Sequence, residues 1–153
     1  MSNNTVEPHK SSFGIDANMA VLIAYLGGMV ISFIPGLKYI AWAVPLVVFF
    51  MESQSNFIKF HAMQSFTLNI FGMILGLIVN WIIGGIITTI MFRSPGAGLG
   101  AAGFLSAISF IIGIIIAIFA LIAVSKGWKY EEYKIPFIGD FAVKLAAMFG
   151  MKV

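Results

Sequence analysis

The side chains best suited to chemistry in this chain lie around the start of its longest apolar run, Phe66–Phe92. An imidazole can transfer protons or bind a metal ion, and amides and hydroxyls can hydrogen-bond a substrate or another helix. The polar residues of this region are His61, Gln64, Ser65, Asn69 and Asn80. A functional interpretation therefore starts from the segment 56–66 and the helix expected to follow it.

These residues do not form a common catalytic or metal-binding pattern. The apolar segments contain no second histidine and no pair of acids at helical spacing. A zinc site needs three or four ligands, and the chain has no cysteine to supply a thiolate ligand, a nucleophile or a disulfide. The glycines after Arg93 lack the Lys-Ser/Thr pair of a phosphate-binding loop. We therefore predict a protein that is not an enzyme and holds no metal ion or cofactor.

The composition is that of a membrane protein. Hydrophobic residues make up 60% of the 153 residues, charged residues make up 10%, and the mean hydropathy is +1.01. Soluble domains are about half apolar and about 25% charged, so this chain has too few charges to cover a surface that faces water. We predict an integral membrane protein with the lipid bilayer as its partner. Nucleic-acid binding is not expected, because the basic residues are scattered beside apolar segments.

Four apolar segments could cross a bilayer as helices, for which about 20 residues are needed. They cover residues 17–34, 38–53, 57–92 and 104–124. The predicted fold class is therefore all-α, an integral membrane four-helix bundle over residues 17–124. Small residues between Arg93 and Gly103 indicate a turn before the last span.

The second segment has the shortest apolar core, residues 39–51, which reaches about 20 Å as a straight helix. Pro45 would kink that helix because it removes one backbone hydrogen bond. The segment fits a short spanning helix, a re-entrant segment or an interfacial one.

Polar segments are expected at both ends of the bundle. Residues 1–16 indicate a flexible polar tail, and residues 125–153 a basic, aromatic tail. In this second tail we predict an interfacial C-terminal amphipathic helix over residues 140–149, with Phe141, Leu145, Met148 and Phe149 on one face. The alternative is an ordinary helix that packs on the spans.

The distribution of basic residues predicts the orientation. With four spans, both termini and the middle loop share one side of the membrane. That side holds Lys10, Lys59, Lys126, Lys129, Lys134, Lys144 and Lys152, whereas Lys38 and Arg93 lie on the other. Since cytoplasmic loops carry an excess of lysine and arginine, we predict a multi-pass protein of the plasma membrane with both termini in the cytoplasm.

The polar residues of the third segment form a stripe. His61, Ser65 and Asn69 are four residues apart, and Gly72, Gly76 and Asn80 continue the stripe at helical spacing. Polar side chains are costly when they face lipid, so the stripe should face protein or water. It could supply interhelical hydrogen bonds of about 0.6–2 kcal/mol each, or line a water-accessible path.

Two blocks resemble a known family. The block Phe57-Ile58-Lys59-Phe60-His61-Ala62-Met63-Gln64-Ser65 resembles the pattern F-[VI]-[RK]-F-H-A-x-Q-[SA] of small four-span membrane proteins. The block Lys126-Gly127-Trp128-Lys129-Tyr130, followed by Tyr133-Lys134-Ile135-Pro136-Phe137-Ile138-Gly139, resembles their tail. These proteins are the bacterial and archaeal relatives of the Tic import subunit of the chloroplast inner envelope.

The Tic-like resemblance implies four membrane helices with both termini on one side, and in plastids an association with a protein-conducting channel. The positions that match its motifs are Pro45, Phe57, Lys59, Phe60, His61, Gln64, Tyr133, Pro136 and Gly139.

Two functions remain open from the sequence. The first is a non-enzymatic, oligomeric membrane component that forms or gates a path, with a second copy or a membrane protein as partner. The second is a membrane adaptor that docks a partner through the edge at His61 and the basic C-terminal tail.

Overall fold

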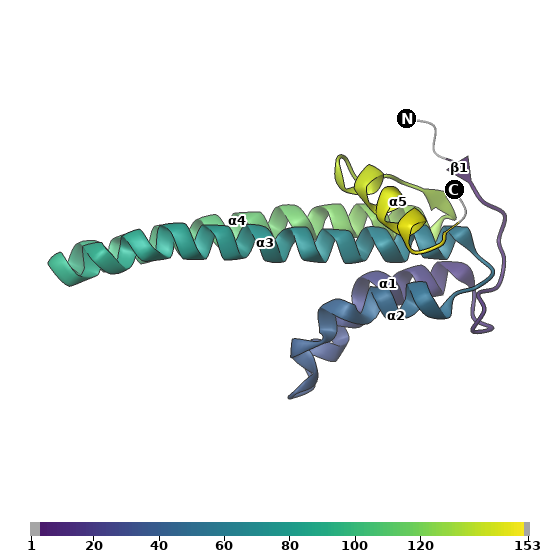
Figure 1. Cartoon of the computed structure of the whole chain (residues 1–153), viewed down its shortest axis with the longest axis horizontal. Helices are drawn as coiled ribbons and strands as arrows, with labels where there is room; N and C mark the ends of the chain where they lie inside the picture. The colour runs from purple at the N-terminus through teal and green to yellow at the C-terminus, as the bar shows by residue number, and fades with distance from the viewer. Residues whose placement is uncertain (1–3, 152–153) are drawn as a thin grey trace. The chain divides into compact units, whose positions relative to one another are not determined.

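A computed structural model describes residues 4–151 of the chain. The fold is all-α and of the membrane type, which confirms the predicted class. The long elements are α1 (Ala17–Ser32), α2 (Val44–Met51), α3 (Asn56–Arg93), α4 (Pro95–Trp128) and α5 (Ile138–Met148), as Figure 1 shows. Short elements are β1 (Asn4–Thr5), β2 (Glu131–Glu132) and the 3-10 helices Leu37–Tyr39 and Ala41–Ala43. The chain forms two compact units: a first unit of residues 4–69 and 119–151, and a second unit of residues 70–118.

The second unit is a helical hairpin made of the later part of α3 and the earlier part of α4. Helix α3 has 38 residues and α4 has 34. At about 1.5 Å per residue, these helices are roughly 57 and 51 Å long. Both are long and apolar enough to cross a membrane. They pack closely at Gly72, where an added Cβ would lie 2.8 Å from Cδ1 of Ile116.

The turn expected at residues 93–103 is much shorter in the structure. Helix α4 begins at Pro95, so only Ser94 separates it from α3. Proline fits the first position of a helix, where its missing N–H is not needed. Gly98 permits the tight reversal, because a Cβ there would lie 2.6 Å from Cα of Met91. A helix also satisfies its own backbone groups in lipid, which favours helix over loop here.

The apolar segments before α3 form short helices in the first unit. Helix α1 has sixteen residues, about 24 Å, and ends before Pro35-Gly36, where Gly36 has a φ of +88°. The segment predicted at 38–53 consists of two 3-10 helices and the eight-residue α2. Pro45 lies in the first turn of α2 and therefore starts a helix instead of kinking one. Of the helices described, only α3 and α4 have the length and hydropathy of a membrane span, so four crossings stay a prediction.

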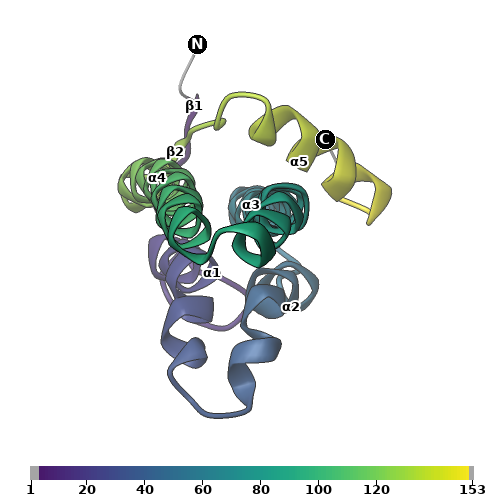
Figure 2. The same cartoon turned by 90° about the vertical axis from the view of Figure 1, so that its left-hand side faces the viewer.

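The core of the first unit lies around the first turns of α3. Helices α1 and α2 pack on one side of this part of α3 and α5 on the other (Figure 2). Small residues on α1 and α5 let these helices approach closely. The core includes Ala17, Ala20, Val21 and Ala24 of α1, Phe49 of α2, Ile58, Ala62 and Met63 of α3, and Ala142 and Ala146 of α5.

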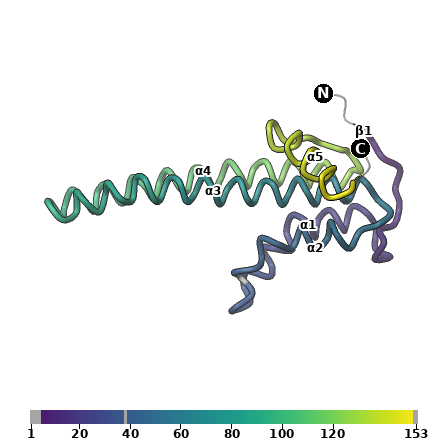
Figure 3. Tube along the Cα trace, in the orientation of Figure 1, coloured from purple at the N-terminus to yellow at the C-terminus, as the bar shows by residue number. Residues whose placement is uncertain are grey.

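The N-terminal segment contacts the C-terminal segment, although the sequence predicts a flexible tail over residues 1–16. Strand β1 pairs antiparallel with β2, with Thr5 opposite Glu131, and the two segments lie at the same end of the first unit (Figure 3). The N–H of Val6 donates to the carbonyl of Tyr130 at 2.8 Å. Backbone pairing of this kind needs no sequence motif, which explains why composition alone indicates a free tail.

Candidate functional site

The start of α3 is held by a cap that the N-terminal segment completes. The N–H of Ile58 donates to Oγ of Ser55 at 3.2 Å, as in an N-cap. Nε2 of His9 lies 2.7 Å from the same Oγ, and the His9 ring meets Phe57 edge-on with centroids 6.1 Å apart. His9 and Ser55 were not among the predicted site residues, because their partners are more than forty residues away in sequence.

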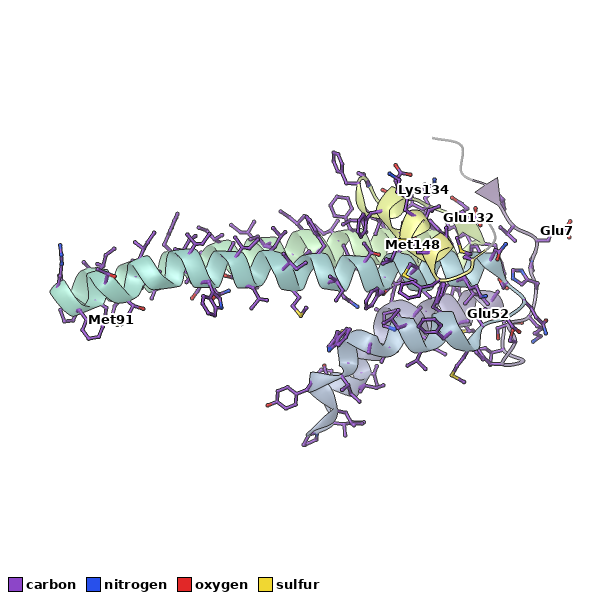
Figure 4. The ribbon with its side chains drawn as sticks, in the orientation of Figure 1. Glu7, Glu52, Met91, Glu132, Lys134 and Met148 are labelled. Carbon is purple, nitrogen blue, oxygen red and sulfur yellow. The ribbon has the colours of Figure 1, made fainter. Side chains whose placement is uncertain are left out.

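Glu52 is a buried carboxylate in the loop between α2 and α3 (Figure 4). Only 1% of its surface is exposed. The backbone N–H and the hydroxyl of Ser12 donate to it, as do the N–H groups of Gln54 at 2.8 Å and Ser55 at 3.0 Å. Burial alone would raise the pKa of Glu52, but these hydrogen bonds outweigh burial and hold the pKa below its usual value. Glu52 therefore ties the N-terminal segment to the loop before α3.

We expect Glu52 to make stability depend on pH in the acid range. A carboxyl with a lowered folded pKa stabilises the fold above its unfolded pKa, about 4.5, and loses that contribution as the pH falls through the folded value. Wild type should therefore unfold at a higher temperature than Glu52→Gln at pH 7, and the gap should close below pH 4.5. The measurement is thermal unfolding of both proteins in mild detergent between pH 7 and pH 3.

Comparing wild type with Glu52→Gln at each pH controls for the titration of other groups. Burial raises the pKa of Glu132, so that group stabilises the fold as the pH falls, which is the opposite sign. Because Glu132 is present in both proteins, its effect cancels in the difference. A gap that does not change with pH would contradict the role given to Glu52.

Gln64 joins three segments of the first unit through its amide. Its Nε2 donates to the hydroxyl of Tyr25 on α1 at 2.9 Å and to the carbonyl of Tyr133 at 3.0 Å. Its Oε1 accepts the N–H of Ile135 at 3.0 Å. The side chain is 0% exposed. Gln64 thus pairs with the C-terminal segment as a neighbouring strand would, with one donor and one acceptor.

His61 is buried one turn before Gln64, with 0% of its surface exposed. Its Nε2 lies 3.3 Å from the carbonyl of Glu131, so this nitrogen is the donor, because a carbonyl only accepts. Among the described residues, Nδ1 has no hydrogen-bond partner. The rings of Tyr25, Phe57 and Phe60 meet the imidazole edge-on. In the described structure the His61 imidazole is therefore enclosed by side chains of its own chain, whereas docking a partner through the edge at His61 would need it accessible.

The two blocks that resemble a family meet in space. We call this contact the clasp: His61 and Gln64 of α3, Tyr25 of α1, and the C-terminal segment 131–139. Gly139 completes it, because a Cβ there would lie 2.8 Å from Oε1 of Gln64. Gly127 is equally restricted, since its Cβ would lie 2.6 Å from Cγ1 of Val21 and 3.4 Å from Cε1 of His61.

The other predicted motif residues have structural positions around the clasp. Tyr133 takes part through its backbone carbonyl, and Pro136 begins a turn in which its carbonyl accepts the N–H of Ile138 at 2.7 Å. Phe57 stacks on Tyr130 with centroids 6.0 Å apart, and Phe60 is buried. The ammonium of Lys59 lies 5.8 Å from the centroid of the Phe49 ring.

The predicted polar stripe divides after Ser65. Oγ of Ser65 donates to the carbonyl of Ala24 on α1 at 2.8 Å, an interhelical bond. Asn69 and Asn80 are exposed on the chain, and Nδ2 of Asn80 donates to the carbonyl of Gly76 on its own helix at 2.8 Å. One continuous stripe facing protein within a single chain is therefore not found. Helical spacing shows which residues share a face but not how far a neighbouring helix covers it.

Residues 16–142 match the model of the magnetosome magnetite crystal formation protein family. The match includes α1 to α4 and the whole clasp. This chain belongs to that family. In this member of the magnetosome magnetite crystal formation protein family, the clasp joins segments near the two ends of the matched region.

Two archaeal relatives extend the comparison. The chain is 29% identical over 133 residues to the UPF0132 membrane protein MJ1443 of Methanocaldococcus jannaschii, which covers 87% of this chain and 91% of the relative. It is 28% identical over 131 residues to the UPF0132 membrane protein MJ1527 of the same organism, covering 86% and 71%. No solved structure matches the chain. The comparisons thus show a membrane protein family, and the finer resemblance to the Tic subunit is not among them.

The arrangement of the clasp favours a structural role. Both N–H groups of the Gln64 amide donate, and its oxygen accepts the N–H of Ile135, so the amide is used within the chain. Within residues 4–151, no three His, Asp or Glu side chains lie together in a way that could hold a metal ion. The clasp fixes α1, α3 and the C-terminal segment to one another.

Proposed function

We propose that the protein is a non-enzymatic integral membrane protein whose copies associate through the α3 face that carries Asn80, and that the assembled helices line a path across the membrane. The supporting observation is the exposed amide of Asn80 midway along the apolar run Phe66–Phe92. A polar side chain at this depth is costly when it faces lipid, so it favours a protein or water neighbour.

The residues around Asn80 suit a close helix contact. Gly76 and Gly84 lie four residues on either side, and a Cβ added at either position would meet no atom within 4 Å. Glycines at this spacing let a second backbone approach, and the Asn80 amide could then bond across the interface. A path needs several copies, because a few helices of one chain enclose little water.

The charges support a cytoplasmic position for the first unit. Most of the basic side chains described belong to it, whereas Arg93 ends α3, at the opposite end of that helix from Lys59. By the positive-inside rule, the first unit would face the cytoplasm of a plasma-membrane protein. The β1–β2 pairing is consistent with both termini lying on that side.

The adaptor function has less support. It depends on docking through His61, and that imidazole is buried in the clasp. The basic tail alone carries no feature that selects a protein partner.

Replacing Asn80 with leucine should weaken self-association. Loss of interhelical hydrogen bonds of about 0.6–2 kcal/mol corresponds to roughly 3- to 30-fold weaker dimerisation. The measurement is single-molecule photobleaching of labelled protein in liposomes, with ion flux recorded on the same samples. Ile82→Leu, an exposed change that removes no polar group, is the matched control.

Three outcomes are informative. Equal association of Asn80→Leu, Ile82→Leu and wild type would refute the Asn80 interface. Monomers in all three would refute the oligomer. Association without ion flux would refute the path for ions but leave the interface standing.

A further inference from the structure

Helix α5 has two distinct faces. One is buried in the core of the first unit and consists of small or aliphatic residues, Ile138, Gly139, Ala142 and Ala146. The opposite face carries Phe137, Phe141 and Met148, which are 92%, 59% and 81% exposed. Phe141 and Met148 are seven residues apart, which is two turns of helix, and Phe137 lies just before the helix. We call these three exposed residues the stripe.

This stripe differs from the face predicted for the C-terminal helix. Leu145 is partly buried against the core, and the Phe149 ring packs edge-on against Phe50, with centroids 5.7 Å apart. Phe141 and Met148 point away from that core. The sequence pattern groups all four because they are close on the helix, but it cannot show which side of the helix the protein covers.

The N-terminal end of α5 lies close to the residues at which the apolar run of α3 begins. Gly139 abuts Gln64, which lies two residues before the apolar run Phe66–Phe92. At the other end, Phe149 contacts the end of α2. Helix α5 therefore lies along the first turns of α3, with its N-terminal end beside Gln64 and its C-terminal end beside α2.

Exposed lysines flank the stripe in the sequence. Lys134 (Figure 4) and Lys144 are exposed on either side of Phe141 in sequence. Nζ of Lys134 lies 3.2 Å from Oδ1 of Asp140. Trp128, at the end of α4, is also exposed. Apolar side chains flanked by lysines and tryptophan are typical of segments that lie in the headgroup region of anionic membranes.

The backbone of Phe137, the residue before α5, has an unusual conformation. It has a φ of +62°, in the left-handed region that non-glycine residues rarely adopt. The clasp constrains the residues on both sides, since Ile135 pairs with Gln64 and Gly139 packs against it. The chain thus holds a large aromatic side chain outward at an unfavourable φ, where no residue of the described structure covers it.

We propose that the Phe137–Phe141–Met148 stripe inserts into the interface of an anionic bilayer, with Lys134 and Lys144 at the lipid phosphates. The inference does not rest on self-association through Asn80. Under this proposal, the clasp also sets the depth at which α5 meets the lipid, because the clasp fixes the C-terminal segment to α3.

The test uses the full chain, which has no native cysteine. Nitroxide labels are placed on Phe141→Cys and Met148→Cys, and on Glu7→Cys, an exposed position of the N-terminal segment, as control. The proteins are placed in nanodiscs of phosphatidylcholine with or without phosphatidylglycerol. Collision rates with oxygen, which partitions into lipid, and with a water-soluble nickel complex are measured by electron paramagnetic resonance.

We expect several-fold lower nickel accessibility and higher oxygen accessibility at positions 141 and 148 than at position 7. The difference should be larger with phosphatidylglycerol and should shrink in Lys134→Gln/Lys144→Gln. Nickel accessibility equal to that of position 7 in both lipids would overturn the proposal. Low accessibility to both reagents would also overturn it, because it would show that protein, such as a second copy, covers the stripe. No effect of phosphatidylglycerol or of the lysine changes would refute the role of the lysines.

Discussion

Replacing Gln64 with leucine is expected to release the C-terminal segment from the start of α3 and to destabilise the first unit strongly. Leucine has a similar size but no amide, so the carbonyl of Tyr133 and the N–H of Ile135 lose their partner. Ile135 is buried, so water cannot easily replace the bond. Each unsatisfied buried group costs about 1–3 kcal/mol, which gives a total of roughly 2–6 kcal/mol.

Trypsin provides the measurement, because Lys129 and Lys134 lie on either side of β2 and become better substrates once the segment is released. Cleavage at these sites and the unfolding temperature in detergent should both report the loss. Ser65→Ala is the matched control, since it removes a single interhelical hydrogen bond worth about 0.5–1.5 kcal/mol. If Gln64→Leu is cleaved and unfolds like Ser65→Ala, the amide does not hold the segment.

Replacing Gly139 with alanine should have an effect of similar size for a steric reason. The new Cβ would lie 2.7 Å from Cβ of Lys134, 2.8 Å from Oε1 of Gln64 and 2.9 Å from Cα of Lys134. Backbone atoms cannot move aside as a flexible side chain can, so the start of α5 must shift away from the clasp. Inserting a methyl group into a packed site costs about 1–3 kcal/mol.

Gly113→Ala is the matched control, because it makes the same glycine-to-alanine change at a position with free space around it. A Cβ there would meet no atom within 4 Å, and alanine favours a helix over glycine by up to about 1 kcal/mol. Gly113→Ala should therefore unfold at or above the wild-type temperature, whereas Gly139→Ala should unfold well below it. Similar unfolding temperatures for the two variants would show that the space around Gly139 is not restrictive. Labels on Gly139→Ala should also show a changed depth for α5 if the clasp positions that helix.

Features that depend on local composition and spacing could be predicted from the sequence. The length of the apolar run Phe66–Phe92 predicts a helix long enough to cross a membrane, and α3 includes all of it. His61, Gln64 and Ser65, which the sequence singles out as polar, each form a hydrogen bond to another segment of the first unit. Pro45 and Pro95 show the limit of this reasoning, because proline both breaks a helix and starts one, and only the surrounding chain decides between the two.

The tertiary structure decided what these residues contact. Gln64 pairs with backbone groups of Tyr133 and Ile135, about seventy residues away, and neither partner is identifiable from its side chain. The N-terminal segment joins β2 for the same reason, since backbone groups pair regardless of composition. Hydropathy is a local property that indicates whether a segment is surrounded by lipid or by water. Helical period is also local and indicates which residues share a face. Which faces meet depends on how distant segments pack, and this placed His61 inside the clasp and left Asn80 outside it.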